Sequence, residues 1–186
     1  MVRKALVLDA NILIRAVLGQ RVRRILETYA DSISFFVPEP AYLEAEEHLP
    51  ALVVKHGDDS AKASVVLRAM AALTTMVGDD LYGAFETEAR KRLSRRDPED
   101  WPILAAALAL GCPIWTEDTD FFGCGVATWT SGSIDIFLAV APSLGFQPSS
   151  AAPLKPRAQA TDGIAMISAL EQRKISNNFA KTYFTG

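Results

Sequence analysis

The 186-residue sequence has little of what several classes of protein require. Its two cysteines, Cys112 and Cys124, are too few for a disulfide scaffold or a zinc site, so we expect free thiols. Charged residues interrupt every apolar run before the roughly 18 residues that a membrane span needs. The first such run stops at Asp9 without a small-residue cleavage site, which argues against a signal peptide. We therefore expect a cytoplasmic protein without a membrane segment.

The sequence also lacks an excess of positive charge, with a formal net charge of -3. Residues 150–186 hold five Lys or Arg against two Asp or Glu, which leaves 14 basic and 20 acidic residues in the rest of the chain. Such an acidic body argues against strong nonspecific binding to nucleic acid, because affinity for phosphates depends on cationic contacts. It does not exclude a nuclease, since a bound metal ion supplies local positive charge.

A single main domain is expected from the length and from a composition that is 49% hydrophobic and 22% charged. We assign it to residues 1–146. Residues 147–160 are rich in Pro and Ser, which is typical of a linker. Residues 161–186 are expected to form a helical tail that docks on another surface, because an isolated short helix is marginal. This basic tail either folds over an acidic cleft or covers exposed core.

Apolar strands alternate with helices along the body, a pattern that predicts an α/β protein with a mostly parallel central sheet in a three-layer α/β/α arrangement. The expected strands are Lys4–Leu8, Ile33–Val37, Thr74–Val77, Ile114–Thr116 and Val126–Trp129. The expected helices are 12–18, 42–49, one from the Asp58–Ser60 caps to about Leu73, 81–93, one from about Asp100 to Gly111, and 133–140.

Two acidic residues follow expected strands directly. Asp9 follows the first strand, and Asp118 follows Ile114–Thr116. Ligands of open α/β sheets bind beyond the carboxyl ends of the strands, so both are candidates for a site. For Asp9 the alternative is a capping or turn carboxylate. Asn11 is expected to cap the first helix rather than to take part in chemistry.

Further acids leave more than one interpretation open. Asp97 precedes a proline and is expected in a turn, whereas Asp100 stands at a helix start, where it either caps the helix or binds metal while the helix dipole keeps it ionised. Asp120 is equally compatible with a site and a turn. Glu44 lies near the edge of the apolar stripe of its helix, a position that permits it to face a cleft.

Arginines and lysines gather just before these acids, at positions 90–92, 95 and 96. They are interpreted either as favourable charge at a helix C-terminus or as RNA contacts. The basic positions 21, 23 and 24 are interpreted either as a solvated helix face or as phosphate contacts.

Several carboxylates at strand and helix ends favour Mg²⁺ or Mn²⁺ over zinc, because these ions prefer oxygen ligands. Such ions activate water and stabilise a departing phosphate oxygen. One alternative is a phosphohydrolase of the haloacid dehalogenase type. Such enzymes have an Asp-x-Asp pair, and Asp118-Thr119-Asp120 has the same spacing. That pair normally closes the first strand, where this chain has Asp9-Ala10-Asn11.

The ordered set of acidic motifs resembles the PIN-domain ribonucleases, a group that includes the VapC-type toxins of toxin-antitoxin pairs. The resemblance covers about residues 3–140 and rests on Leu8-Asp9-Ala10-Asn11-Ile12-Leu13-Ile14, on Pro38 followed by Glu44, on Asp97-Pro98-Glu99-Asp100 leading into Ala105–Leu108, and on Ile114-Trp115-Thr116-Glu117-Asp118-Thr119-Asp120-Phe121.

This resemblance implies that Asp9, Glu44, Asp100 and Asp118 are catalytic, metal-binding acids, with Asp120 in a supporting place at the metal. It also implies Mg²⁺- or Mn²⁺-dependent endonucleolytic cleavage of RNA, a homodimer and an antitoxin partner. The role of Asp97 stays open, and the tail lies outside the family pattern. A PIN-like module that binds RNA or protein without cleaving it is the non-enzymatic alternative.

Overall fold

The computed structural model describes residues 4–56 and 59–139. The expected domain boundary at 146, the linker 147–160 and the tail 161–186 lie outside these residues, as does Asp58. No helix within the described ranges is long and apolar enough to cross a membrane.

Five parallel strands form the central sheet, in the order β3-β2-β1-β4-β5. This confirms the predicted parallel sheet. The strands are β1 (Lys4–Leu8), β2 (Ile33–Pro38), β3 (Thr75–Val77), β4 (Ile114–Trp115) and β5 (Thr128–Trp129).

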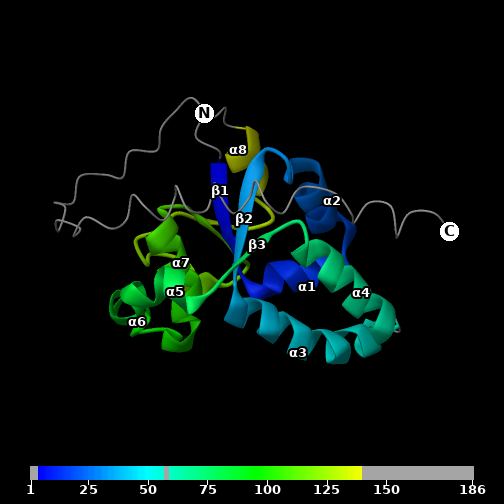
Figure 1. The fold of residues 1–186 in the computed structure, drawn as a ribbon, viewed down its shortest axis with the longest axis horizontal. Helices are drawn as coiled ribbons and strands as arrows, with labels where there is room; N and C mark the ends of the chain where they lie inside the picture. Colours follow the sequence, from blue (N-terminus) through cyan, green and yellow to red (C-terminus); the bar gives the residue numbers. More distant parts are fainter. Residues whose placement is uncertain (1–3, 57–58, 140–186) are drawn as a thin grey trace. The chain divides into compact units, whose positions relative to one another are not determined.

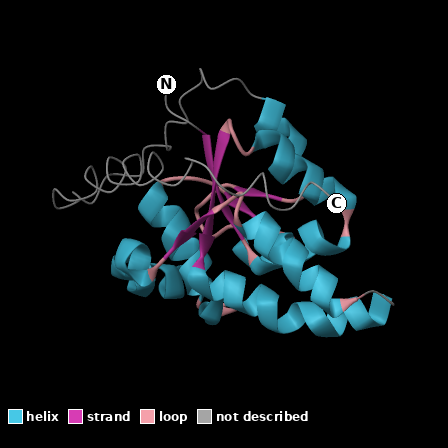
Figure 2. Ribbon diagram, turned by 45° about the vertical axis from the view of Figure 1, so that its right-hand side comes forward, coloured by secondary structure: helices cyan, strands magenta, loops and turns pink. Residues whose placement is uncertain are grey.

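Helices cover both faces of the sheet, which confirms the three-layer α/β/α class (Figures 1 and 2). In Figure 1, α1, α3 and α4 lie on one side of the strands and α5, α6 and α7 on the other. The helices are α1 (Ala10–Leu18), α2 (Gln20–Tyr29), α3 (Glu39–His56), α4 (Ser60–Ala71), α5 (Asp79–Tyr82), α6 (Glu86–Leu93), α7 (Trp101–Leu110) and α8 (Ile134–Ala139), with 3-10 turns η1 (Gly83–Phe85), η2 (Pro98–Asp100) and η3 (Thr119–Phe121).

The helix α7 occupies the core because its sequence is apolar on every side. Residues 102–107 are all buried, and the helix contacts both β1 and β2. Pro102 lies in its first turn, and Gly111 ends it with a φ of 61°. These are the start and stop signals that the sequence predicts, since proline suits a first turn and glycine a left-handed cap. Asp100 therefore immediately precedes this buried helix, and β4 follows its other end.

Several expected element boundaries are wrong. The first helix begins at Ala10, with Asp9 at its N-cap position, so Asn11 lies inside the helix and does not cap it. No bounds were predicted for the helix α2, although the basic positions 21, 23 and 24 were interpreted as a possible helix face. The helix α3 continues through Pro50 to His56, because the buried Leu49 and Val53 compensate for the hydrogen bond that proline cannot donate.

The predicted helix 81–93 is also interrupted. It divides into α5, the turn η1 and α6, and the change of geometry begins at Gly83. Glycine has a poor helix propensity, and short 3-10 segments commonly connect helices. As a result α6 is an independent two-turn helix packed against α7 and η2.

The strand order reverses between β1 and β4. β2 and β3 follow β1 on one side, whereas β4 and β5 lie on its other side. Leu8 is paired with Trp115 at the carboxyl ends of these two strands, and the Asp9 N–H donates to the Trp115 carbonyl at 3.2 Å. Ligands of doubly wound sheets bind at such a switch point. The chain therefore brings Asp9 and Thr116 together where a ligand is expected.

Candidate active site

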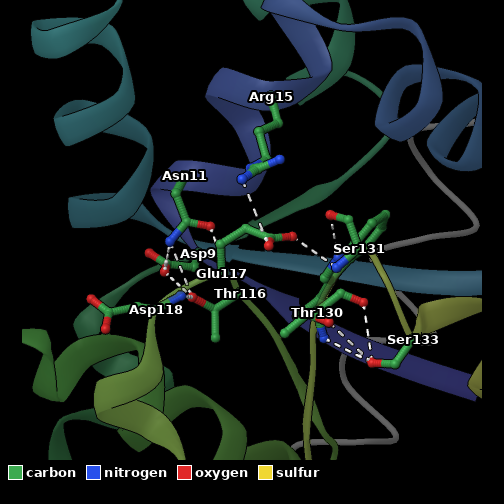
Figure 3. Close-up of polar contacts among 10 residues, drawn as sticks. Asp9, Asn11, Arg15, Thr116, Glu117, Asp118, Thr130, Ser131 and Ser133 are labelled. Atoms are coloured by element: carbon green, nitrogen blue, oxygen red, sulfur yellow. Dashed lines mark hydrogen bonds and ion pairs between the residues drawn. The ribbon is translucent and has the colours of Figure 1, made fainter.

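Asp9 is the most buried of the candidate acids, with 5% of its surface exposed. One of its carboxylate oxygens, Oδ2, accepts hydrogen bonds from the Asn11 side-chain amide and from the Thr116 hydroxyl (Figure 3). A buried carboxylate is costly unless it is hydrogen-bonded, so these two donors stabilise Asp9 at this position. Asn11, expected to be a helix cap, is instead a partner of Asp9.

Thr116 and Asn11 also join the end of β1 to the segment after β4. The Thr116 hydroxyl oxygen accepts from the Asp118 N–H at 2.8 Å and from the Asn11 amide at 3.1 Å. The Asn11 carbonyl oxygen accepts from the Glu117 N–H at 3.1 Å. A hydroxyl has one proton to donate and two lone pairs. Thr116 uses all three, which fixes Asp118 relative to Asp9.

Glu117 points away from this network and connects other loops (Figure 3). Its carboxylate accepts the Ser131 N–H at 2.7 Å and lies 3.7 Å from the Arg15 guanidinium. Burial acts to raise the pKa of Glu117, but hydrogen bonds from Ser131 and the positive charges of Arg15 and Arg21 bring it below its usual value. Glu117 therefore remains charged and holds the segment after β4 against the turn before α8.

Asp97 and Asp100 differ in how they use their side chains. The Asp97 carboxylate accepts the Glu99 N–H at 2.9 Å and begins η2, as expected for a turn residue. Asp100 occupies the N-cap position of α7 but makes no side-chain capping hydrogen bond. The capping interpretation of Asp100 is therefore wrong, and its carboxylate is half-buried and subject to the negative charges of other acids.

Burial raises the pKa of Asp9 to about 6, even though the hydrogen bond from Thr116 opposes the shift, and the negative charges of Glu44 and Asp118 add to it. Burial likewise raises the pKa of Asp100 to about 7, with further contributions from nearby acids. The helix dipole, which was expected to keep Asp100 ionised, is therefore not the dominant influence on its pKa. Desolvation and like charges outweigh the dipole here.

The negative charges that act on Asp9 and on Asp100 come from acids that are far apart in the sequence. The charges that raise the pKa of Asp100 belong, in decreasing order, to Asp9, Asp97, Asp118 and Glu44. Asp120 is absent from the charges that act on Asp9 or on Asp100. Its N–H donates to the Asp118 carboxylate at 2.8 Å, so its backbone supports Asp118 directly.

The donor chemistry of this group fits a hard divalent cation. Carboxylate oxygens are the ligands that Mg²⁺ and Mn²⁺ prefer, and a cation would relieve the repulsion that raises the two pKa values. Within the described ranges, however, no three Asp, Glu, His or Cys side chains lie close enough to hold an ion together. Mg²⁺ usually keeps several water molecules and takes only one or two carboxylates directly. The arrangement therefore fits a hydrated ion rather than a closed protein cage.

The chain is similar to known proteins in sequence pattern and in fold. The sequence pattern of the PIN domain matches residues 7–139, which span β1 to α8 and include all of the candidate acids. The chain belongs to the PIN-domain family. No curated protein sequence matches it.

Solved structures show the same PIN fold at low sequence identity. One is VapBC2 from Rickettsia felis bound to a DNA fragment from its promoter, with 14% identity, a TM-score of 0.53, and coverage of 68% of this chain and 98% of that chain. Another is PAE2754 from Pyrobaculum aerophilum, with 17% identity, a TM-score of 0.57, and coverage of 74% of this chain and 90% of that chain. At these identities the likeness extends to the fold alone.

Two functional candidates of the PIN domain were missed or misjudged from sequence. Thr116 was expected only as the end of a buried strand, and Asn11 only as a cap. The signal was the shared spacing, with a polar residue two positions from an acid in both Asp9-Ala10-Asn11 and Thr116-Glu117-Asp118. Because β1 and β4 are neighbours, these two motifs meet at the switch point.

Proposed function

We propose that this PIN-domain chain is a divalent-metal-dependent endoribonuclease that hydrolyses phosphodiester bonds of RNA. Asp9, Glu44, Asp100 and Asp118 are its catalytic, metal-binding acids, and Asp120 supports the metal site. The cofactor is Mg²⁺ or Mn²⁺. The nuclease domain spans residues 1–146, and the protein acts in the cytoplasm as a homodimer.

One observation carries the proposal: Asp9 is buried at the switch point of the sheet of a PIN-domain chain, and the negative charges of Glu44 and Asp118, from distant parts of the sequence, raise the pKa values of both Asp9 and Asp100. In the absence of a cation such an arrangement is unfavourable. Strongly perturbed groups of this kind mark functional sites more often than ordinary surface positions.

The protein's own residues prepare this site for phosphodiester hydrolysis. Asn11 and Thr116 fix the orientation of the Asp9 carboxylate, and Thr116 fixes the backbone at Asp118. Asp100 lies at the start of the buried helix α7, on a different segment of the chain from Asp9 and Asp118. A divalent cation bound there would polarise a phosphate oxygen and lower the pKa of a nearby water molecule. Positioning of the acids before the ion binds reduces the reorganisation that the reaction requires.

A toxin-antitoxin role for this chain is supported by the fold it shares with VapBC2, a protein solved with promoter DNA. An antitoxin protein is the corresponding partner. The alternative is a PIN domain that binds RNA or protein without cleaving it. The absence of three ligands at bonding distance among the described residues is the observation that favours this alternative.

Cleavage of RNA by the purified full-length protein tests the proposal. Wild type, Asp9→Asn and Asp118→Asn should be compared in Mg²⁺, Mn²⁺ and EDTA, with Glu47→Gln, an exposed acid of α3, as a control. We expect metal-dependent cleavage by wild type and Glu47→Gln, and a loss of at least about 100-fold in the two site variants. Cleavage indifferent to EDTA and to both site substitutions would refute the nuclease proposal. Binding of RNA without any cleavage by wild type would favour the non-catalytic alternative.

A further inference from the structure

The segment that carries Asp118 has few regular hydrogen bonds of its own. After Asp118 the chain makes one turn of 3-10 helix, η3, and then passes through Gly123 and Gly125, whose φ angles are 86° and 87°. The next strand, β5, begins only at Thr128. Irregular segments of this kind depend on side chains from elsewhere to fix their backbone. The position of Asp118, whose N–H is held by Thr116, therefore depends also on what holds the loop that follows it.

Two arginines from α6 and the turn after it supply that support. Arg96 donates from Nη1 to the carbonyl oxygens of Thr119 and Asp120, at 2.5 and 2.8 Å. Arg92 donates from Nη1 to the Cys124 carbonyl at 3.2 Å. The guanidinium groups of both arginines thus bind the protein backbone, a role that neither interpretation of the basic run included.

The glycine at position 125 allows Arg92 to lie close to the loop backbone. A Cβ atom at Gly125 would lie 2.9 Å from Nη1 of Arg92, so a larger residue there would push the guanidinium away. The Arg92 Nε also donates to Glu88 at 2.8 Å, which fixes the orientation of the planar group. The glycine that permits the left-handed turn therefore also permits the arginine contact.

Arg96 has a special place because it connects two acid-bearing segments. It stands four residues before Asp100 in the chain, at the start of the segment that leads through η2 to α7. Its guanidinium donates a hydrogen bond to the carbonyl oxygen of Asp120. The N–H of Asp120 in turn donates to the Asp118 carboxylate. One side chain thus links the segment that carries Asp100 to the segment that carries Asp118.

We propose that Arg96 is a positioning residue that sets the separation of Asp100 and Asp118 for cation binding, with Arg92 holding the far end of the same loop. The inference rests on the proposed function for its role in cleavage. Both carbonyl oxygens accept from Nη1 of Arg96, and the planar guanidinium holds the two N–H bonds of that nitrogen in fixed directions, whereas a lysine ammonium is a freely rotating point charge. Lysine at position 96 therefore preserves the charge and only part of the positioning.

The test compares full-length wild type with Arg96→Ala and Arg96→Lys. The matched control is Arg95→Ala, which removes an exposed arginine from the adjacent position. Mn²⁺ affinity is measured by titration calorimetry without RNA, loop order by amide hydrogen exchange of residues 119–125 in the metal-free protein, and kcat and KM on RNA.

We expect Arg96→Ala to weaken Mn²⁺ binding by about tenfold or more, as removal of groups that orient metal ligands does. Its loop amides should exchange faster, and kcat should fall while KM changes little. Arg96→Lys should be intermediate in Mn²⁺ affinity, and Arg95→Ala should retain the wild-type Mn²⁺ affinity and loop exchange. Thermal melts of each variant establish that it is folded.

Unchanged Mn²⁺ affinity in Arg96→Ala would overturn the inference, and a rise in KM alone would assign Arg96 to substrate contact. If the inference fails in either way but wild type still cleaves RNA, the proposed function stands. If wild type binds Mn²⁺ but cleaves no RNA, the proposed function fails, and the Mn²⁺ affinity of Arg96→Ala still decides the inference. A wild-type protein that binds no Mn²⁺ overturns both.

Discussion

Replacement of Asp100 by asparagine should stabilise the metal-free protein at alkaline pH. The folded state raises the pKa of Asp100 to about 7, mainly through burial and then through the charges of neighbouring acids. Asparagine has a similar size and no charge, and the Asp100 side chain makes no capping hydrogen bond that the substitution would remove. The variant therefore isolates the electrostatic cost of placing this acid in the site.

The direction of the pH dependence follows from the number of protons that the folded and unfolded states bind. Between pH 4 and 7 the unfolded chain releases the Asp100 proton while the folded protein retains it, so the contribution of Asp100 to stability falls as pH rises through this range. A shift of about three pKa units corresponds to about 4 kcal/mol. Because Asp100 is only half-buried, screening by solvent reduces this to about 1–2 kcal/mol. The full penalty is present above pH 7 and absent below pH 4.

Urea denaturation in EDTA at pH 4.5 and pH 8 measures the effect. We expect the free energy of unfolding of Asp100→Asn to exceed that of wild type by about 1–2 kcal/mol at pH 8 and to match it within about 0.5 kcal/mol at pH 4.5. The control Glu47→Gln alters an exposed acid of α3 and should leave both values unchanged within the same margin. An Asp100→Asn variant that is less stable than wild type at pH 8 would refute this account of the site.

Three other perturbations test separate parts of the structure. Thr116→Val removes the donor to Asp9 and the acceptor for the Asp118 N–H, and should cost about 1–3 kcal/mol in urea denaturation. Gly111→Ala meets no neighbouring atom within 4 Å, so its φ of 61° alone should cost about 1–2 kcal/mol in the same assay. Truncation at Ser149 should leave RNA cleavage and the oligomeric state unchanged, because we assign the nuclease activity to residues 1–146.

Each of these predictions has its own control. Thr116→Ser keeps the hydroxyl and should lose much less stability than Thr116→Val; equal losses would assign the effect to packing. Gly111→Asn should cost less than Gly111→Ala, since asparagine tolerates the left-handed region better. Loss of cleavage or a change in oligomeric state on truncation would show that the tail takes part in the function.

The fold could be predicted from the sequence because its signals are local. Apolar strands bounded by polar residues give the sheet, and Pro102 and Gly111 give the ends of α7. The predictions failed where tertiary contacts override a local preference. The helix α3 continues through Pro50 because Leu49 and Val53 are buried, and Asn11 accepts a hydrogen bond from the Glu117 N–H, in the segment after β4, instead of capping its own helix.

The site was accessible to sequence reasoning only in part. The acids at strand ends follow from the pattern, because the carboxyl ends of neighbouring parallel strands meet at one edge. The raised pKa of Asp100 does not follow, since it depends on burial and on acids more than 50 residues away in sequence, such as Glu44 and Asp9. The roles of Arg92 and Arg96 do not follow either, because nothing local distinguishes an arginine that binds backbone from one that contacts solvent.

The central claim is that Asp9, Glu44, Asp100 and Asp118 together bind the cation that cleavage requires. The most direct measurement is an anomalous-difference map from crystals of the full-length protein grown with Mn²⁺. We predict a peak among these four acids, about 2 Å from at least one carboxylate oxygen and with water completing the coordination. A protein that cleaves RNA in Mn²⁺ but shows no peak among these acids, or binds the ion elsewhere, would contradict the account.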